Sequence, residues 1–279
     1  MSTFAAWFRL VRAGWILTRE GVFAALPGEQ LSGLPKTGWR VARLLARRRA
    51  KGRERSQRLA RAVDRLGPSY VKLGQFLATR PDVVGKDIAM DLASLQDQMA
   101  TFPTAEAIAE VEDSLGRPVG ELFARFDEPI AAASIAQVHP AVVLRDGEAV
   151  KVAVKVIRPG VRRRFFNDLE SYFLAARLQE RFIPSSRRLR PVEVTRTLAQ
   201  TTKIEMDLRL EAAALSELAE NTRDDPGFRV PWVDWERTGR DVVTMEWVDG
   251  VKMNDIEGLR AAGHDLKALA AALVQSFLR

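Results

Sequence analysis

Apolar residues recur every three or four positions through most of the first 125 residues, and this spacing predicts amphipathic helices. One helix is expected at the N-terminus. A second helical region is expected over about 69–99 and a further helix over 104–115, because Gly67-Pro68 and Gly116-Arg-Pro118 interrupt the pattern. The first part of the chain is therefore predicted to be entirely helical.

From residue 126 to residue 156 the pattern changes to short alternating apolar runs, which are typical of strands. Asp146-Gly147 separates two of these runs and predicts a tight hairpin. The next segments are predicted to be helical over 161–183 and 191–221, extended near 228–235 and 241–248, and helical again from His264 onward. Helices followed by strands, with a long helical insertion, predict an α+β fold.

Composition narrows the chemistry that the chain can perform. The 279 residues include no cysteine, which excludes disulfides, thiolate catalysis and cysteine-based zinc sites and indicates a reducing compartment. His139 and His264 are the only sources of imidazole, and they lie far apart in the sequence. We therefore expect neither a metal site nor a Ser-His-Asp triad in this chain.

The formal charge of +7 is concentrated in a basic segment over residues 36–61, whose only acidic residue is Glu54. Its basic members are Lys36, Arg40, Arg43, Arg47, Arg48, Arg49, Lys51, Arg53, Arg55, Arg58 and Arg61. Such a segment attracts the phosphates of anionic lipid or of nucleic acid. A solvated helix face without a partner is the alternative.

The N-terminal helix favours a membrane as that partner. Its large apolar residues lie mostly at helical spacing, and three arginines interrupt them, so the segment is too short to span a bilayer and is typical of an interfacial helix. The apolar residues are Phe4, Trp7, Phe8, Val11, Trp15, Ile16 and Phe23, and the arginines are Arg9, Arg12 and Arg19. No transmembrane segment or secretory signal is expected. Packing of this helix on the protein's own core is the alternative.

Lys155 ends the apolar run Val152-Ala-Val-Lys155, and strand alternation places it on the same face as Ala153 and Ile157. A lysine buried on an apolar strand face costs free energy unless an anion meets it, so we expect a phosphate, a glutamate or both beside Lys155. A solvated lysine at a sheet edge is the alternative.

Three other groups of residues are candidates for the same site. The first group precedes the hairpin, at the place where a kinase carries its glycine-rich loop, and consists of Ala131, Ala132, Ala133 and Ser134. Their Cβ atoms predict a stiffer loop than a kinase has. A packed helix face or a tight turn is the alternative.

The second group lies in a predicted helix and consists of Lys72, Gly74 and Gln75. Gly74 lowers helix stability by roughly 1 kcal/mol, which suggests that another group approaches the backbone closely at that position. Glu205 and Asp207 are expected on different sides of one helix turn, with Glu211 on the face of Asp207. Because Arg209 lies among them, a surface ladder of ion pairs is the alternative.

Together these motifs resemble the UbiB family, atypical kinase-like proteins of ubiquinone biosynthesis, over roughly residues 60–279. The motifs are Lys72-x-Gly74-Gln75, Ala131-Ala-Ala-Ser134-Ile-Ala-Gln-Val, Val-Ala-Val-Lys155-Val-Ile-Arg-Pro, Arg188-Leu-Arg-Pro191, Glu205-x-Asp207 and Met245-Glu-Trp-Val-Asp-Gly250. The resemblance implies a protein-kinase-like N-lobe of antiparallel sheet plus helices, an N-terminal helical extension that folds over the active site, and only the start of a C-lobe. The predicted division is 1–60 for the amphipathic and basic segment, 61–125 for the extension, 126–250 for the N-lobe and 251–279 for the start of the C-lobe.

The resemblance also implies roles for individual residues. Lys155 would bind the α and β phosphates of ATP and pair with Glu211, the segment from Ala131 to Ser134 would cover the phosphates, and Glu246 to Val248 would receive adenine. Lys72, Gly74 and Gln75 would enter the nucleotide pocket from the extension and meet Glu205 and Asp207 there. The implied activity is that of an ATPase that supports quinone synthesis at a membrane.

One departure from the family's pattern limits this expectation. The family's catalytic-loop segment and its Asp-Phe-Gly do not occur among the 279 residues, so the catalytic and metal-binding aspartates are expected after Arg279. We therefore expect a fragment that holds no catalytic residue, lacks Mg-dependent hydrolysis and exposes apolar surface near its end.

The expected cofactor is ATP, with Mg²⁺ in the full-length protein. The expected partners are ATP or ADP, anionic membrane lipid, and either quinone-biosynthesis proteins or a prenylated quinone precursor, whereas no nucleic acid is expected. The expected location is cytoplasmic and peripheral on the inner membrane. The alternative function is a nucleotide-independent scaffold that binds membrane lipid.

Overall fold

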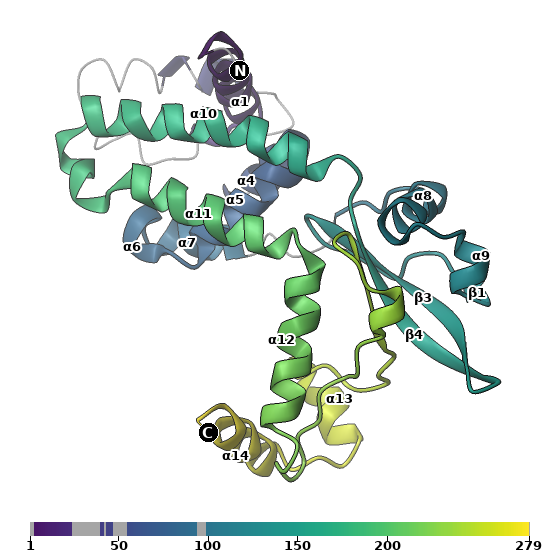
Figure 1. Ribbon diagram of the computed structural model, residues 1–279. Helices are drawn as coiled ribbons and strands as arrows, with labels where there is room; N and C mark the ends of the chain where they lie inside the picture. Colours follow the sequence, from purple (N-terminus) through teal and green to yellow (C-terminus); the bar gives the residue numbers. More distant parts are fainter. Residues whose placement is uncertain (1–2, 24–39, 42, 47–54, 94–98, 279) are drawn as a thin grey trace. The chain divides into compact units, whose positions relative to one another are not determined.

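The computed structural model describes residues 3–23, 40–41, 43–46, 55–93 and 99–278, which fall into a helical unit and a sheet unit (Figure 1). The helical unit comprises residues 1–101, 132–135 and 158–204, and the sheet unit comprises residues 102–131, 136–157 and 205–279. Each unit thus combines stretches that are distant in sequence, whereas the predicted four-part division follows sequence order.

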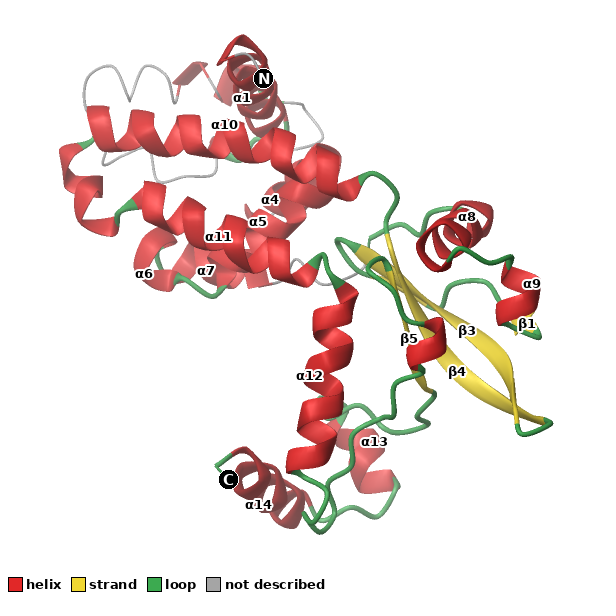
Figure 2. Ribbon diagram, in the orientation of Figure 1, coloured by secondary structure: helices red, strands yellow, loops and turns green. Residues whose placement is uncertain are grey.

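The helical unit contains only helices among its described elements (Figure 2). They are α1 (Thr3–Arg19), α4 (Arg55–Leu66), α5 (Pro68–Ala78), α6 (Pro81–Val84), α7 (Lys86–Ala93), α10 (Val161–Phe182), the 3₁₀ helix η3 (Pro184–Leu189) and α11 (Pro191–Glu205). The single helical region predicted over 69–99 is divided into α5, α6 and α7 because Pro81 restarts the helix and Gly85 adopts a φ of 86°. Part of that predicted region, residues 94–98, lies outside the described residues.

Two contacts of α10, one with α5 and one with the end of α4, order the interior of the helical unit. The rings of Tyr70 and Tyr172 meet edge to face with centroids 5.1 Å apart, and burial raises the pKa of Tyr70 to about 12. Arg164 donates to the carbonyl oxygen of Leu66 at 3.0 Å and crosses directly over Gly67. A Cβ at Gly67 would lie 2.3 Å from the Arg164 guanidinium, and its φ is 98°, so this position requires glycine.

The sheet unit places a small antiparallel sheet among helices, which confirms the predicted α+β class and the resemblance to a kinase N-lobe (Figure 2). The strand order is β1-β3-β4-β5, and β2 also pairs with β3. The strands are β1 (Arg125–Phe126), β2 (Ala131–Ala132), β3 (Ala136–Arg145), β4 (Glu148–Ile157) and β5 (Val242–Glu246). The helices are α8 (Thr104–Leu115), α9 (Val119–Leu122), α12 (Leu208–Asn221), η4 (Trp235–Arg237), α13 (Ile256–Ala261) and α14 (Leu266–Phe277).

The β3–β4 hairpin has the predicted tight turn. Arg145 pairs with Glu148 across a two-residue loop, and Asp146 and Gly147 adopt φ angles of 54° and 83°. Two consecutive positive φ angles match the twist of the flanking strands, and Asp-Gly reaches them at low cost. The hairpin therefore fixes the β3–β4 register and with it the face on which each side chain lies.

Two predicted elements are wrong. The extended run near 228–235 forms no strand, because Pro231 has no N–H to donate to a ladder and only the isolated bridge between Val233 and Met245 remains. The helix predicted over 191–221 is interrupted after Glu205: Asp207 has an extended backbone and accepts a hydrogen bond from the Arg209 N–H, so it caps a separate helix, α12.

One face of the sheet is closed by α8, α9 and the segment before them. Val152, Val154 and Val156 point into this core and are fully buried, beside Val111 of α8 and Leu122 of α9. The other face carries the residues of β4 that alternate with these valines, among them Ala153 and Lys155. Burial of the valine face stabilises the sheet unit, since apolar area removed from water contributes about 25 cal/mol per Å².

Two polar side chains, Gln137 and His139, lie on this buried face with their hydrogen bonds satisfied. The Gln137 amide accepts from the Phe102 N–H at 3.0 Å, donates to the Phe102 carbonyl at 3.2 Å and lies 2.9 Å from His139 Nε2. His139 Nδ1 lies 2.8 Å from the Asp127 carbonyl, which only accepts, so Nδ1 carries the proton. Burial lowers the pKa of His139, and the network holds it neutral.

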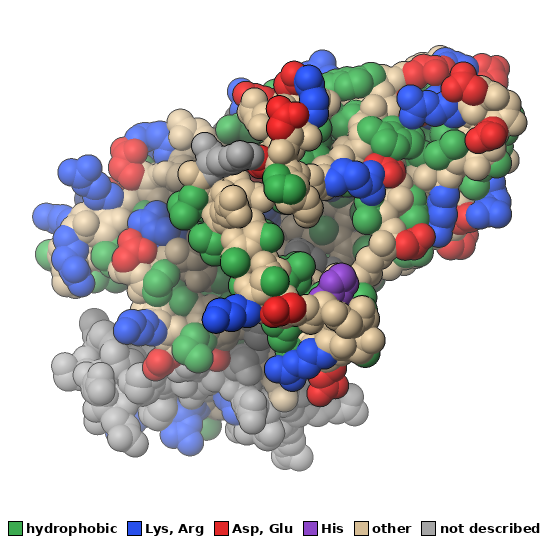
Figure 3. Space-filling model, turned by 90° about the horizontal axis from the view of Figure 1, so that it is seen from below, with side chains coloured by type: hydrophobic (Ala, Val, Ile, Leu, Met, Phe, Trp, Pro, Cys, Tyr) green, Lys and Arg blue, Asp and Glu red, His purple; other side chains and the backbone are tan. Residues whose placement is uncertain are grey.

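The last helix, α14, has no buried residue and exposes Leu273, Val274, Phe277 and Leu278. The expectation of exposed apolar surface near the end of the chain therefore agrees with the structure. Elsewhere apolar and charged side chains are interspersed, as the space-filling view of one face shows (Figure 3).

Candidate functional site

Lys155 lies on the open face of the sheet, opposite the valine core. Its register partner on β5 is Val243, and the neighbouring pair on the same face is Ala153 with Met245. As expected, a glutamate meets Lys155, whose side chain is only partly buried, with 27% exposed. The reason is strand alternation, which assigns Val152, Val154 and Val156 to the closed core and Lys155 to the face that α12 only partly covers.

Glu211, in the first turn of α12, meets Lys155 on this face. The Lys155 ammonium donates to Glu211 Oε1 at 2.8 Å and to Oε2 at 2.7 Å. The Glu211 side chain is 37% exposed, and a partly exposed ion pair contributes at most about 1 kcal/mol to folding. An ammonium has three donors, so the pair leaves one for an additional anion.

The start of α12 is fixed by local interactions. Asp207 accepts from the Arg209 backbone N–H at 3.2 Å and binds its guanidinium at 2.7 and 2.9 Å. The hydrogen bond from the Arg209 side chain lowers the pKa of Asp207. The Leu208 N–H donates to the Arg240 carbonyl at 3.0 Å, beside the sheet. These contacts set the direction in which Glu211 points.

The interruption before α12 overturns one predicted arrangement. Glu205 ends α11, Asp207 precedes α12, and Glu211 lies inside it, so Asp207 and Glu211 do not share a helix face. The alternative given for these residues, a ladder of surface ion pairs, is confirmed for one pair, Asp207 with Arg209.

The segment from Glu246 to Val248 begins at the last residue of β5 and leaves the sheet. The Glu246 N–H donates to the Trp232 carbonyl at 2.9 Å, and its carboxylate pairs with Arg229. Val248 is 51% exposed, and its backbone N–H has no hydrogen-bond partner among the residues that the structure describes. Of the two residues predicted to receive adenine, Val248 therefore presents a donor, whereas the Glu246 N–H is already engaged.

The alanine-rich segment leads into β3. Ala131 and Ala132 form β2, and a bend at Ser134 and Ile135 leads into β3, so the alternative of a packed helix face is wrong. Buried Ser134 donates from Oγ to the Gln75 amide oxygen of α5 at 3.2 Å, within the helical unit. The Lys-x-Gly-Gln motif and the alanine-rich segment are thus in direct contact.

Lys72 and Gly74 also lie on α5, where Gly74 is buried and Lys72 is half-buried. Lys72 belongs to the helical unit, and Glu205 and Asp207 belong to the sheet unit. Their predicted meeting in a nucleotide pocket stays a prediction. Within the described ranges, His, Asp and Glu side chains form no group of three suited to a metal ion.

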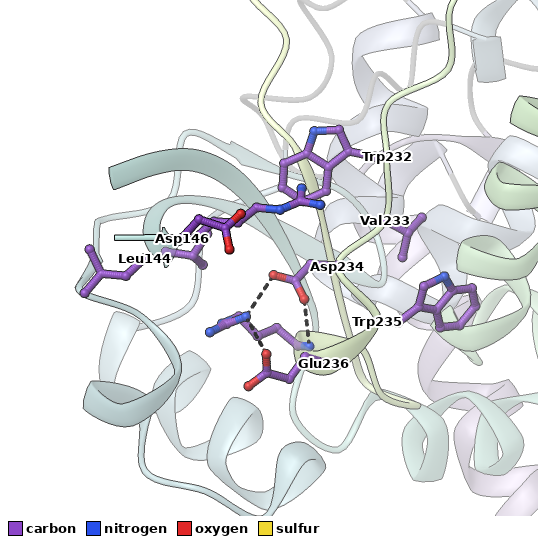
Figure 4. A pocket seen from close by; sticks show the side chains of 10 residues that line it. Leu144, Asp146, Trp232, Val233, Asp234, Trp235 and Glu236 are labelled. Carbon is purple, nitrogen blue, oxygen red and sulfur yellow. Dashed lines mark hydrogen bonds and ion pairs between the residues drawn. The ribbon is translucent and has the colours of Figure 1, made fainter. Parts of the chain in front are cut away.

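Sequence reasoning missed a pocket of about 540 Å³ between the tip of the β3–β4 hairpin and the segment around η4 (Figure 4). Arg145 covers the ring of Trp232 at 5.0 Å, and Asp234 binds the Arg237 guanidinium at 3.0 Å. Trp235 is exposed beside them. Lys155 and Glu211 do not line this pocket. The sequence signal for this pocket was the pair Trp232 and Trp235, each of which is followed within two positions by an acidic residue.

Comparison with known proteins decides the family. Residues 94–279 match the model of the ABC1 atypical kinase-like domain, which is more than half of the chain. The chain belongs to the ABC1 atypical kinase-like family. The expected relationship to UbiB is confirmed by curated proteins named "Probable protein kinase UbiB".

The relative from Marinobacter nauticus is 40% identical over 273 residues, which cover 96% of this chain and 49% of that protein. The relative from Pseudomonas aeruginosa is 43% identical over 224 residues, which cover 80% of this chain and 42% of that protein. The relative from Cellvibrio japonicus is also 43% identical, with 80% and 40% covered. This ABC1-family chain thus spans somewhat less than half the length of these relatives.

Proposed function

We propose that this chain carries the nucleotide-phosphate site of an ATP-binding atypical kinase or ATPase. The whole protein would support ubiquinone biosynthesis at the cytoplasmic face of the inner membrane, acting with quinone-biosynthesis proteins or on a prenylated quinone precursor. The observation that carries the proposal is the bidentate contact between Lys155 and Glu211 on the open face of the sheet. The family match and the name of the UbiB relatives support it.

The residues around Lys155 suit the parts of a nucleotide. Glu211 holds the ammonium in place, and the remaining donor binds phosphate oxygens as a point charge. Ala153 and Met245, adjacent in register, offer an apolar surface to the adenine ring, and Val248 offers its N–H. Mg²⁺ bound with ATP would neutralise phosphate charge in the full-length protein.

Titration with a nucleotide series tests this site. We expect ATP and ADP to bind saturably, and adenosine to bind at least tenfold more weakly because it has no phosphate for Lys155 to contact. Isothermal titration calorimetry at fixed ionic strength measures the three affinities. Equal affinity for adenosine and ATP would show that Lys155 contacts no phosphate. If none of the three ligands binds, the proposal is refuted.

A second candidate function, lipid binding independent of nucleotide, is favoured by α1. Its aromatic side is exposed: Phe4 by 81%, Phe8 by 66% and Trp15 by 53%. Its other side packs on α10, where Arg9 binds Glu170 at 2.8 Å and Ala6 and Ala13 are buried. The alternative of packing on the protein's own core holds for this side, and the exposed aromatic side supports the proposed lipid contact. No helix in the described ranges is long and apolar enough to cross a bilayer.

The basic segment, the second half of the proposed lipid contact, lies largely outside the described residues. The members outside are Lys36, Arg47, Arg48, Arg49, Lys51 and Arg53. Within the described part, Arg58 donates to the Gly21 carbonyl at 3.4 Å, just after α1. The proposed lipid contact therefore rests on the exposed aromatic side of α1.

Replacing Trp7 and Trp15 with serine is expected to weaken binding to anionic vesicles at least tenfold. Both rings are substantially exposed, so their removal costs little folding energy but removes apolar area that the bilayer interface would bury. Cosedimentation with phosphatidylglycerol vesicles measures the change. Trp235→Ser, which removes a ring 52% exposed on the sheet unit, is the control. Equal loss in both variants, or none in either, would contradict the assignment to α1.

A further inference from the structure

A basic depression of about 610 Å³ lies in the helical unit, where α10, η3 and α11 meet. Four of its lining residues are arginines: Arg177 and Arg181 from the last turns of α10, Arg187 from η3, and Arg190, which ends η3. The remaining lining residues are Glu180, Val192 and Glu193. We call this depression the arginine pocket. Its positive side chains come from two consecutive elements, α10 and η3 with its C-cap.

Among the described residues, neither glutamate of the arginine pocket pairs with a pocket arginine. Glu180 Oε1 accepts from the Val192 backbone N–H at 3.1 Å, and Glu193 pairs with Arg196 on the next turn of α11. Within the described part of the chain, none of the four pocket arginines forms an ion pair with a carboxylate. The pocket therefore holds four guanidinium groups against two carboxylates, and an excess of positive charge remains.

The hydrogen bonds and ring contacts of these arginines hold them in place without cancelling their charge. Arg187 donates to the backbone carbonyls of Glu180 at 2.7 Å and Arg181 at 3.5 Å. The guanidinium carbons of Arg177 and Arg181 lie 5.9 and 5.5 Å from the rings of Phe173 and Phe182. A guanidinium keeps donors free on its other edge in such contacts.

Arg190 adds a second indication. It adopts a left-handed backbone conformation, with φ 48° and ψ 57°, directly before Pro191. A residue with a Cβ pays roughly 1 kcal/mol or more for this conformation, and glycine or asparagine would adopt it more easily. An arginine is therefore placed here at an energetic cost, with its side chain lining the pocket.

We propose that the arginine pocket binds a phosphate-bearing anion. Clustered guanidinium groups repel one another until an anion joins them, and their planar forks match phosphate oxygens. A lipid headgroup and a soluble phosphate ester both carry this chemistry. Phe182 and Ile183, 69% and 49% exposed beside the pocket, are placed to enter the interface of a bilayer if the source is lipid.

The test compares two variants with the same loss of charge. Arg177→Gln with Arg190→Asn removes two pocket arginines; glutamine suits a helix, and asparagine suits the left-handed position, so this variant is expected to fold. Arg163→Gln with Lys203→Gln removes two exposed charges from α10 and α11 outside the pocket. Both pairs are introduced into a Lys155→Ala background, so that phosphate binding at Lys155 does not contribute.

Calorimetric titration with pyrophosphate and sedimentation with vesicles of phosphatidylglycerol and phosphatidylcholine form the two arms. We expect the pocket variant to bind at least tenfold more weakly than the control variant in one arm. A difference with pyrophosphate identifies a soluble phosphate as a sufficient ligand, and a difference with vesicles alone identifies a lipid headgroup. Equal behaviour of the two variants in both arms, or no binding in either arm, would overturn the proposal. None of these outcomes depends on whether Lys155 binds nucleotide.

Discussion

Replacing Lys155 with alanine is expected to weaken ATP binding about a hundredfold or more. Hydrogen bonds to charged groups contribute roughly 1.5–3 kcal/mol each, and each 1.4 kcal/mol is tenfold in affinity. The variant also leaves the Glu211 carboxylate, which now touches the ammonium at 2.7 Å, without its partner and facing the phosphates. Calorimetric titration of ATP into the variant and the unaltered chain measures the loss.

The fold is expected to survive this substitution. The Lys155 side chain is 27% exposed and lies opposite the valine core, so its ion pair contributes at most about 1 kcal/mol to stability. Lys267→Ala, at an exposed position of α14, is the matched control and should leave ATP affinity unchanged. If Lys155→Ala binds ATP as tightly as Lys267→Ala does, Lys155 contacts no phosphate.

Replacing Gln137 with leucine is expected to lower the free energy of unfolding by about 3 kcal/mol or more. The Gln137 amide satisfies the N–H and carbonyl of Phe102 and faces His139 Nε2, all on the buried face of the sheet. Leucine is more apolar, yet it leaves these three groups without a partner, and each buried unsatisfied group costs about 1–3 kcal/mol. Urea denaturation monitored by tryptophan fluorescence measures the change.

Gln200→Leu, the same exchange at an exposed position of α11, is the control and should change stability by less than about 0.5 kcal/mol. If hydrophobic burial outweighed hydrogen bonding at residue 137, the leucine variant would be at least as stable as the unaltered chain. That result would show that the hydrogen bonds between Gln137 and Phe102 do not hold the segment before α8 against the sheet.

The sequence predicted the elements whose signals are local. Asp146-Gly147 specified the hairpin because both residues tolerate positive φ, and Pro103 and Gly116 bracketed α8 at the predicted bounds. The interruption at Asp207 was missed because apolar periodicity continues through it, and only the capping hydrogen bond to Arg209 reveals the new helix. Local pattern alone does not show where one helix ends and an adjacent one begins.

The site was predictable as a set of residues but not as a geometry. Alternation placed Lys155 on a face but did not say which face is closed, since that depends on where α8 packs. The contact between Ser134 and Gln75 joins segments far apart in sequence and has no local signal. The arginine pocket was likewise missed, because only one of its arginines, Arg190, lies in a motif, and the others have no local signal that gathers them around the end of α10.

Affinity labelling tests the central claim most directly. An acyl phosphate of ATP transfers its acyl group to a lysine amine that lies beside the bound phosphates, forming an amide and releasing ATP. With the Lys155 ammonium between Glu211 and the proposed phosphate position, we predict that mass spectrometry of the digested protein finds the label on Lys155 and that excess ATP prevents it. Labelling confined to other lysines, or labelling of Lys155 that ATP does not reduce, would contradict the account.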